Sequence, residues 1–425
     1  MIFKNSNFNN RYIKYIASLS SGTVIAQSIT FFFSPIITRL YSAQEYGNLS
    51  LFASLVVFLS IFGNLSYHYA IILPKKKSEA ESLFLLTFYI NLAFSLLLLF
   101  VILLLMKVNS HFPSFPKPLL VLLPLGVFSN NLSYLFTYWL NRLEAYHQIS
   151  FSKVLQTSSV GLSQVFLTAY SGIGLQLGYI IGRILSATSQ FFMRRAAFPL
   201  FFNKLKFKEI KASAIKYINH PKYIFLSDVL SIGGIEIPVL LISLFYSADL
   251  VGFYGLSHKI LSIPTAFLGL AVDQVFFQRL SDKISQNKPV LHLLKKTWFY
   301  LFIIGVIPFL LIFLFGSSLF SWVFGANWGE AGRIASVLSP LLLLQYISGA
   351  TGKSLIALQK QKYQSLFSLC IFLSRAGGIM FGVWQGSFYA GLIALVILNA
   401  ISLIGYDVFI FYMIRNYEKT ITKDS

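Results

Sequence analysis

The amino-acid sequence predicts an all-α polytopic membrane protein, with about twelve transmembrane helices in two parallel-repeat six-helix lobes around a central cavity. The composition is 56% hydrophobic and 11% charged, with a mean hydropathy of +0.70, which is more apolar surface than a soluble core could bury. Apolar windows of roughly 20 residues, the length of a spanning helix, recur along almost the whole chain. Spanning β-strands alternate apolar and polar residues, whereas residues 92–106 are apolar on every side.

Successive apolar windows predict the individual helices. They cover 15–39, 46–72, 79–106, 118–140, 147–170, 173–193, 223–246, 250–276, 293–324, 330–357, 363–384 and 388–414. The first window is too long for a signal-peptide core, so we expect a retained helix. The single cysteine, Cys370, excludes an intramolecular disulfide, and the six histidines show no metal-ligand spacing. We therefore expect neither a metal nor another cofactor.

The net charge is +20, and the positions of the basic residues along the chain indicate the orientation of the protein in the membrane. If the N-terminus lies inside, 25 basic residues fall in inside segments and only three, Arg39, Lys107 and Lys117, fall outside. Because Lys and Arg in short loops favour the cytoplasmic side, this asymmetry predicts that both termini are cytoplasmic. It also argues against nucleic acid as the partner of the basic residues.

A short internal repeat predicts the two lobes. Tyr41-Ser42-Ala43, followed by Gly47 and Leu51, reappears 205 residues later as Tyr246-Ser247-Ala248, followed by Gly252 and Leu256. Both copies fall in a short outside turn and run in the same direction across the membrane, which is typical of a parallel repeat. We therefore expect lobes at 1–195 and 223–425, with a cleft between them.

The linker at 196–222 is rich in lysine. Phe207, Ile210, Ala214 and Tyr217 recur in it at helical spacing, which predicts an amphipathic helix on the inner leaflet. A plain positive-inside loop explains the same composition equally well.

Charged residues inside apolar windows are the candidate site residues. Arg183, Glu236, Lys259 and Arg375 lie nearest the expected midplane, where each costs roughly 2.5–3.5 kcal/mol unless it is wet or paired. They therefore line a cavity or form ion pairs between helices, for example Glu236 with Lys259 or Arg183. The carboxylates nearer the helix ends include Asp228, Asp273 and Asp407.

Periodicity and prolines add further candidates. Lys259 and Asp273 are 14 residues apart, close to one helix face, and Arg39 shares a polar stripe of the first helix. Pro35 and Pro238 occupy near-equivalent places at the start of each lobe. Each proline removes a backbone hydrogen bond, so both are candidate hinges, although kinks that only shape a static bundle fit as well.

Several short motifs near the N-terminus resemble those of a known family, the Wzx-type polysaccharide flippases of the multidrug/oligosaccharidyl-lipid/polysaccharide exporter superfamily. The motifs are Ser21-Gly22-Thr23, Ser34-Pro35, Thr38-Arg39-Leu40-Tyr41, Glu45-Tyr46-Gly47 and Ala70-Ile71-Ile72-Leu73-Pro74. The resemblance covers about the first 80 residues and returns weakly between Gly252 and Pro264.

The resemblance implies a multi-pass protein of the bacterial cytoplasmic (inner) membrane, acting in lipopolysaccharide (O-antigen) or capsule biosynthesis. It implies that the protein flips undecaprenyl-pyrophosphate-linked repeat units to the periplasmic leaflet by alternating access, driven by an ion or the membrane potential. Besides this substrate and the membrane lipids, polysaccharide-assembly proteins are a partner class that the resemblance raises.

The candidate residues can be assigned roles on this interpretation. Cations in a partly dehydrated cavity bind pyrophosphate without a covalent step, which favours Arg183, Lys259, Arg375 and Arg39 as substrate-binding residues. Carboxylates in or near the membrane can take up a proton or sodium as coupling ion. The carboxylates with this predicted role are Glu236, Asp228 and Asp273.

Three other functions are weaker. Gly349-Ala350-Thr351-Gly352-Lys353-Ser354 resembles the end of a P-loop but lacks the first glycine and a preceding strand. A membrane glycosyltransferase or polymerase would need a large outside loop with catalytic residues, so we do not expect an enzyme. A drug/cation antiporter of the same superfamily is the closest alternative, although a cation exporter would need an acidic cavity.

Overall fold

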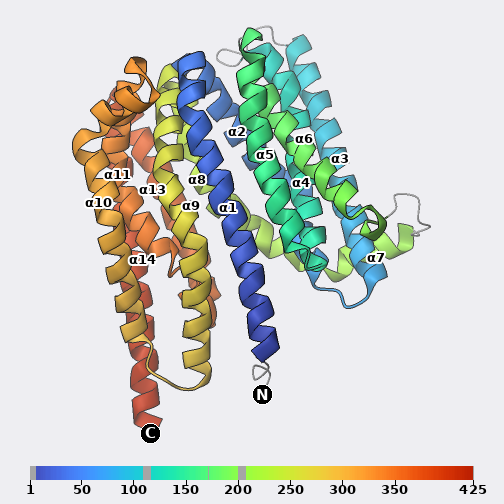
Figure 1. Cartoon of the computed structure of the whole chain (residues 1–425), viewed down its shortest axis with the longest axis vertical. Coiled ribbons are helices and arrows are strands. Elements are labelled where there is room, and N and C mark those ends of the chain that lie inside the picture. The colour runs from blue at the N-terminus through green and yellow to red at the C-terminus, as the bar shows by residue number, and fades with distance from the viewer. Residues whose placement is uncertain (1–5, 109–115, 171, 200–206, 425) are drawn as a thin grey trace. The chain divides into compact units, whose positions relative to one another are not determined.

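The computed structural model describes residues 6–108, 116–170, 172–199 and 207–424. All regular elements in these ranges are helices, which confirms the predicted all-α class (Figure 1). Twelve long helices correspond one to one to the twelve predicted windows. They are α1 (Ser6–Leu40), α2 (Ala43–Asn64), α3 (Lys77–Val108), α4 (Lys117–Arg142), α5 (Tyr146–Phe166), α6 (Gly174–Met193), α8 (Phe225–Phe245), α9 (Ala248–Ser285), α10 (Leu291–Phe324), α11 (Gly329–Gly349), α13 (Gln361–Trp384) and α14 (Phe388–Asp424).

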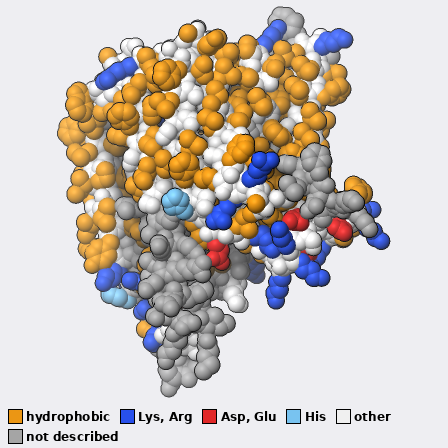
Figure 2. Space-filling view, turned by 45° about the vertical axis from the view of Figure 1, so that its right-hand side comes forward, with side chains coloured by type: hydrophobic (Ala, Val, Ile, Leu, Met, Phe, Trp, Pro, Cys, Tyr) orange, Lys and Arg blue, Asp and Glu red, His pale blue; other side chains and the backbone are white. Residues whose placement is uncertain are grey.

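The length and the apolar surface of these helices indicate that they span a membrane. Nine helices of the described part are long and apolar enough to cross a membrane, and the other three of the twelve long helices, α5, α6 and α9, are not among them. Hydrophobic side chains also cover most of the visible face in the space-filling view (Figure 2). Exposure of so much apolar area is stable only in lipid.

The chain divides into two compact units, unit 1 (Met1–Glu236) and unit 2 (Ile237–Ser425). The boundary falls inside α8, two residues before Pro238. The predicted domain limits, with a linker at 196–222, stay a prediction, and residues 200–206 of that linker lie outside the described residues. The part of the linker that is described contains the predicted amphipathic helix, α7 (Phe207–Lys216).

The repeated Tyr-Ser-Ala motif has a local structural meaning. Ser42 and Ser247 are the residues that cap α2 and α9, with nearly equal dihedral angles (φ −71°, ψ 163° and φ −71°, ψ 154°). Ser42 Oγ accepts from Glu45 N at 3.2 Å, and Ser247 Oγ accepts from Leu250 N at 3.4 Å. The serine of each copy thus satisfies a backbone donor of the first helical turn. The parallel relation between the predicted lobes stays a prediction.

Two predicted windows are interrupted in the structure. The window 46–72 breaks after α2, because Leu65 and Ser66 adopt left-handed φ values of 45° and 59°, and the short helix η1 (Tyr67–Ile72) follows. The window 330–357 breaks after Gly349, and a turn leads to the short α12 (Ser354–Ala357). Both breaks lie next to partly buried carboxylates, as described below.

A cluster of buried aromatic and aliphatic side chains holds one end of unit 1 together. It joins η1, the start of α3, the end of α4 and the chain after α6. Its buried members include Tyr67, Ile71, Phe84, Trp139 and Phe198. The basic segments predicted to be inside, at 75–77, at Arg142 and on α7, all adjoin this cluster or its elements.

Unit 2 has a corresponding cluster. It joins the end of α9, the starts of α10 and α13, α12, and the second half of α14, and its members include Phe276, Leu294, Leu355 and Ile410. Glu418 on α14 accepts hydrogen bonds from the backbone nitrogens at the start of α10, at 2.6 and 2.7 Å. The basic segments of this half that are predicted to be inside, at 279–296, 360–362 and 415–423, therefore adjoin one cluster at one end of unit 2.

Candidate functional site

Three buried asparagines connect α2, α3 and α4 in the interior of unit 1. Asn64 Nδ2 donates to Asn131 Oδ1 at 2.8 Å, and Asn131 Nδ2 donates to Asn91 Oδ1 at 3.1 Å. Asn91 Nδ2 in turn donates to the carbonyl oxygen of Phe128 at 3.1 Å. Buried amides are costly unless they are satisfied, so this chain fixes three helices relative to one another. Sequence analysis missed these residues, although amides inside apolar windows could have revealed them.

Arg183 on α6 extends a second polar chain from the same turn of α4. Its Nε donates to Asn130 Oδ1 at 2.8 Å, and Asn130 Nδ2 donates to Ser60 Oγ on α2 at 2.9 Å. The guanidinium lies over the ring of Tyr179, 3.4 Å from its centroid. Among the described residues Arg183 forms no ion pair with a carboxylate. Glu236 lies within electrostatic range of the same Tyr179.

Asp228 on α8 lies at the break that follows α2. Its Oδ2 accepts from Ser66 Oγ at 2.7 Å, and the hydroxyl of Tyr69 lies within hydrogen-bonding range of the same carboxylate. In the described ranges Asp228 forms no ion pair with Lys, Arg or His. A carboxylate that only hydroxyl groups stabilise can take up a proton or a small cation.

His68 lies beside this carboxylate site in η1. Its side chain is buried, its ring is tilted against that of Tyr69 with 4.0 Å between ring centroids, and it contacts Tyr138 edge-on. Burial, together with the nearby His220, lowers the pKa of His68 to about 3. The imidazole is therefore neutral at physiological pH and packs as an aromatic ring.

The other predicted carboxylate, Asp273, is paired with a cation in unit 2. Its Oδ2 lies 2.5 Å from Nζ of Lys353, which is in the turn between α11 and α12. The Asp273 side chain is 13% exposed and the Lys353 side chain 45%. Sequence analysis placed Asp273 near a helix end and Lys353 in the P-loop-like segment, but did not pair them.

Asp407 on α14 is a second carboxylate that accepts a hydrogen bond from a serine hydroxyl. That serine, Ser348, lies five residues before Lys353. Ser348 Oγ donates to Asp407 Oδ2 at 2.6 Å, and the hydroxyl of Tyr406 donates to the carbonyl oxygen of Gly352 at 2.8 Å. Trp298 Nε1 donates to Thr351 Oγ1 at 3.0 Å. The P-loop-like residues therefore form a turn between two helices that packs against α10 and α14. Asp407 is a candidate that sequence analysis noted in a helix but did not assign to the site.

The remaining predicted cations are distributed over both units. In unit 2, Arg375 on α13 is 9% exposed and lies within electrostatic range of His258, the neighbour of Lys259 on α9. Arg39 is exposed in the last turn of α1, which also contains Pro35. That these cations and Arg183 share one cleft, and that Pro35 and Pro238 act as hinges, stay predictions. The described residues hold no cluster of three or more His, Cys, Asp or Glu that could bind a metal.

Comparison with known proteins identifies the family. Residues 36–331 match the model of the family described as "Polysaccharide biosynthesis protein". No curated protein matches the sequence.

Solved membrane exporters share the fold. The structure is similar to that of the lipid II flippase MurJ in its inward closed conformation, with a TM-score of 0.71 and 16% identity over 95% of this chain and 90% of that one. It is also similar to an inward-facing multidrug resistance transporter of the MATE family in the MOP superfamily, with a TM-score of 0.62 and 14% identity over 95% of each chain. These findings confirm the resemblance noted from the sequence, and the chain belongs to the polysaccharide biosynthesis protein family.

Proposed function

We propose that this protein is a flippase that moves undecaprenyl-pyrophosphate-linked oligosaccharide repeat units from the cytoplasmic to the periplasmic leaflet. The family match supports a role in polysaccharide biosynthesis, and a fold shared with a lipid II flippase supports transport of a lipid-linked sugar. The cytoplasmic membrane, the O-antigen or capsule pathway and the cytoplasmic termini are parts of this proposal. Transport of this kind needs binding and movement, and no catalytic step is part of the mechanism.

The observation that carries the proposal is the environment of Arg183. A cation in the apolar part of a membrane protein costs several kcal/mol unless an anion or water compensates it. Asn130 and Tyr179 orient the guanidinium, but neither contributes a full negative charge. A pyrophosphate group would supply that charge and accept the fork of guanidinium donors. Lys259, Arg375 and Arg39 are the further cations proposed to meet the substrate.

Movement of the substrate requires a change between inward-open and outward-open states. We propose that uptake and release of a proton or sodium at Asp228, Glu236 or Asp273 drives this change, with bending at Pro35 and Pro238. Pro238 lies at the boundary between the two compact units, where a bend in α8 would be most effective.

A genetic experiment tests the transport function. Deletion of the gene should abolish surface polysaccharide and cause lipid-linked repeat units to accumulate in the cell. Complementation with Arg183→Lys should restore part of the polysaccharide, whereas Arg183→Gln at equal protein level should not. Full restoration by Arg183→Gln would refute the role of the cation, and normal surface polysaccharide in the deletion strain would refute the function.

Export of drugs in exchange for cations is the second candidate, favoured by the similarity to a multidrug transporter structure. It predicts that the deletion strain becomes sensitive to cationic dyes while its surface polysaccharide is unchanged. Measurements of surface polysaccharide and dye sensitivity in the deletion strain therefore distinguish the two functions.

A further inference from the structure

The amphipathic helix α7 is fixed on α3 in unit 1. Lys216 forms an ion pair with Glu79 on α3, and the hydroxyl of Tyr67 donates to the carbonyl oxygen of Ala214 at 3.0 Å. Ile210 packs against the buried cluster of unit 1. The two helices therefore form a groove with defined walls, which we call the α3–α7 groove.

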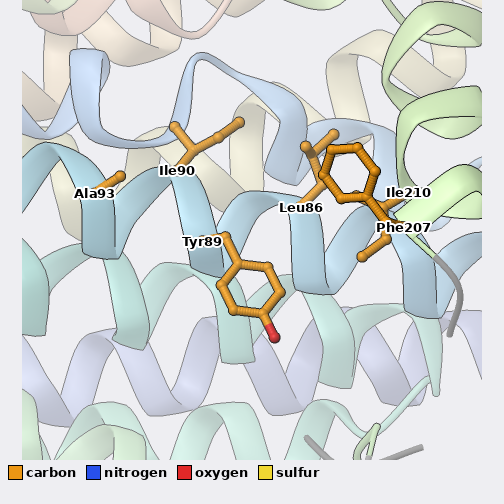
Figure 3. A pocket seen from close by; sticks show the side chains of 6 residues that line it. All are labelled: Leu86, Tyr89, Ile90, Ala93, Phe207 and Ile210. Atoms are coloured by element: carbon orange, nitrogen blue, oxygen red, sulfur yellow. The ribbon is translucent and has the colours of Figure 1, made fainter. Parts of the chain in front are cut away.

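The inner part of the α3–α7 groove is apolar. It is a cavity of about 560 Å³, lined by aliphatic and aromatic side chains from both helices. Leu86, Phe207 and Ile210 meet at one end of it, and Tyr89, Ile90 and Ala93 continue along α3 (Figure 3). Tyr89 is 47% exposed and Phe207 is 80% exposed, so the cavity opens to the surroundings of the helix. This volume falls in the range of roughly 300–1,000 Å³ that is typical of small-molecule sites.

The outer part of the groove is polar. It is a cavity of about 270 Å³ between the first turns of α3 and the rest of α7, and its lining includes two lysines, two glutamates and three serines. Lys216 and Glu79 neutralise each other in the ion pair. Lys76 and Glu209 form no ion pair among the described residues, so one positive and one negative charge face the cavity.

The spacing of the two parts matches the depth profile of a bilayer. Glu79 and Ile90 are 11 residues apart on α3, which is about 16 Å along the helix axis. The polar part lies at the beginning of the membrane-spanning segment Lys77–Lys107, and the apolar part lies several turns inside it. A ligand that fits both parts has a small charged group and a chain that enters the hydrocarbon region, which is the chemistry of a phospholipid.

We propose that the α3–α7 groove binds a zwitterionic phospholipid of the phosphoethanolamine class, with its ammonium group at Glu209, its phosphate at Lys76 and an acyl chain in the apolar cavity. The paired charges of the outer cavity favour a zwitterion over an anionic headgroup, which Glu209 would repel. A primary ammonium group donates three hydrogen bonds, which a quaternary choline group cannot do. The site is independent of what the protein exports.

Native mass spectrometry tests the site with purified protein and mixed micelles containing equal amounts of phosphatidylethanolamine and phosphatidylglycerol. The wild type should retain phosphatidylethanolamine in preference to phosphatidylglycerol. Ala93→Phe, which fills the cavity, should abolish most of this retention. Leu97→Phe, one turn further along the same lipid-exposed helix, is the matched control and should retain the lipid like the wild type. Equal retention by Ala93→Phe and the wild type would overturn the proposal.

Two further results test the occupant. Glu209→Gln should lose the preference for ethanolamine over glycerol headgroups, and an unchanged preference would refute the headgroup assignment. An undecaprenyl phosphate that displaces the bound phospholipid at equal concentration would show that the groove belongs to the exported lipid instead. Phe207→Ala, which removes the α7 wall at an exposed position, should weaken retention and serves as a second variant if Ala93→Phe does not fold.

Discussion

Units 1 and 2 each hold a carboxylate with a serine hydroxyl next to a broken helix, but they differ in what surrounds it. In unit 1 Ser66 donates to Asp228 at 2.7 Å, and Tyr69 lies within range of the same group. In unit 2 Ser348 donates to Asp407 at 2.6 Å, while Asp407 Oδ1 is buried without a hydrogen-bond partner among the described atoms.

The two units also differ in whether the broken helix contributes to an ion pair. The turn after Ser348 contributes Lys353 to a pair with Asp273, whereas the break after α2 contributes only hydroxyl groups and a neutral histidine. A carboxylate paired with lysine stays ionised and holds helices together, whereas one held by hydroxyl groups can change its protonation state. The comparison therefore favours Asp228 over Asp273 as the coupling residue.

The largest expected effect is on transport. Asp228→Asn should reduce export to that of cells without the protein, because an amide cannot take up the coupling ion, while the amide oxygen still accepts from Ser66. Asp273→Asn should retain measurable export, since its role is to hold Lys353. Measurement of surface polysaccharide at matched protein levels checks both. Full export by Asp228→Asn would contradict the assignment of Asp228 as the coupling residue.

The ion pair of unit 2 should matter for stability. Lys353→Ala leaves Asp273 without its cation and should cost about 3 kcal/mol, at the lower end for a buried pair because the lysine is partly exposed. Thermal unfolding in detergent measures the loss. The double variant with the charges exchanged, Asp273→Lys and Lys353→Asp, should recover part of it, and no recovery would argue against a direct pair.

The two serines should differ in the same assay. Ser348→Ala removes the only hydrogen bond seen at the Asp407 carboxylate in the described structure and should cost about 2 kcal/mol. Ser66→Ala should cost about 1 kcal/mol, because Tyr69 remains beside Asp228. Equal losses, or a larger loss for Ser66→Ala, would contradict this difference.

The last expected effect, similar in size to those of the serine variants, is the pH dependence from His68. Its pKa is lowered from 6.5 to about 3 in the folded state, so acidification protonates the unfolded chain first. Stability from this residue is complete above pH 6.5 and decreases as the pH falls towards 3, by at most roughly 1.4 kcal/mol per pH unit. Unfolding of the wild type and His68→Asn at pH 7 and 5.5 measures it. The advantage of the wild type should shrink at pH 5.5, and a constant difference would exclude the shift.

Sequence patterns predicted the helices well because lipid requires long apolar helical segments, and composition alone reveals them. The break at Leu65 and Ser66 was not predictable, since neither residue is glycine and Ser66 is held by Asp228, 162 residues away. The asparagine network was missed for a related reason. Hydropathy windows average over single amides, and pairing between helices depends on their three-dimensional packing.

The most direct test of the proposed function is a flipping assay with the purified protein. Proteoliposomes would contain undecaprenyl-pyrophosphate-linked oligosaccharide only in the inner leaflet, and an added glycosidase would report on sugar that reaches the outer leaflet. We expect wild-type protein to expose the sugar under an imposed ion gradient, and Arg183→Gln to expose little more than protein-free vesicles do. Equal exposure in vesicles with and without the wild-type protein would contradict the proposal that this chain is a flippase for lipid-linked sugars.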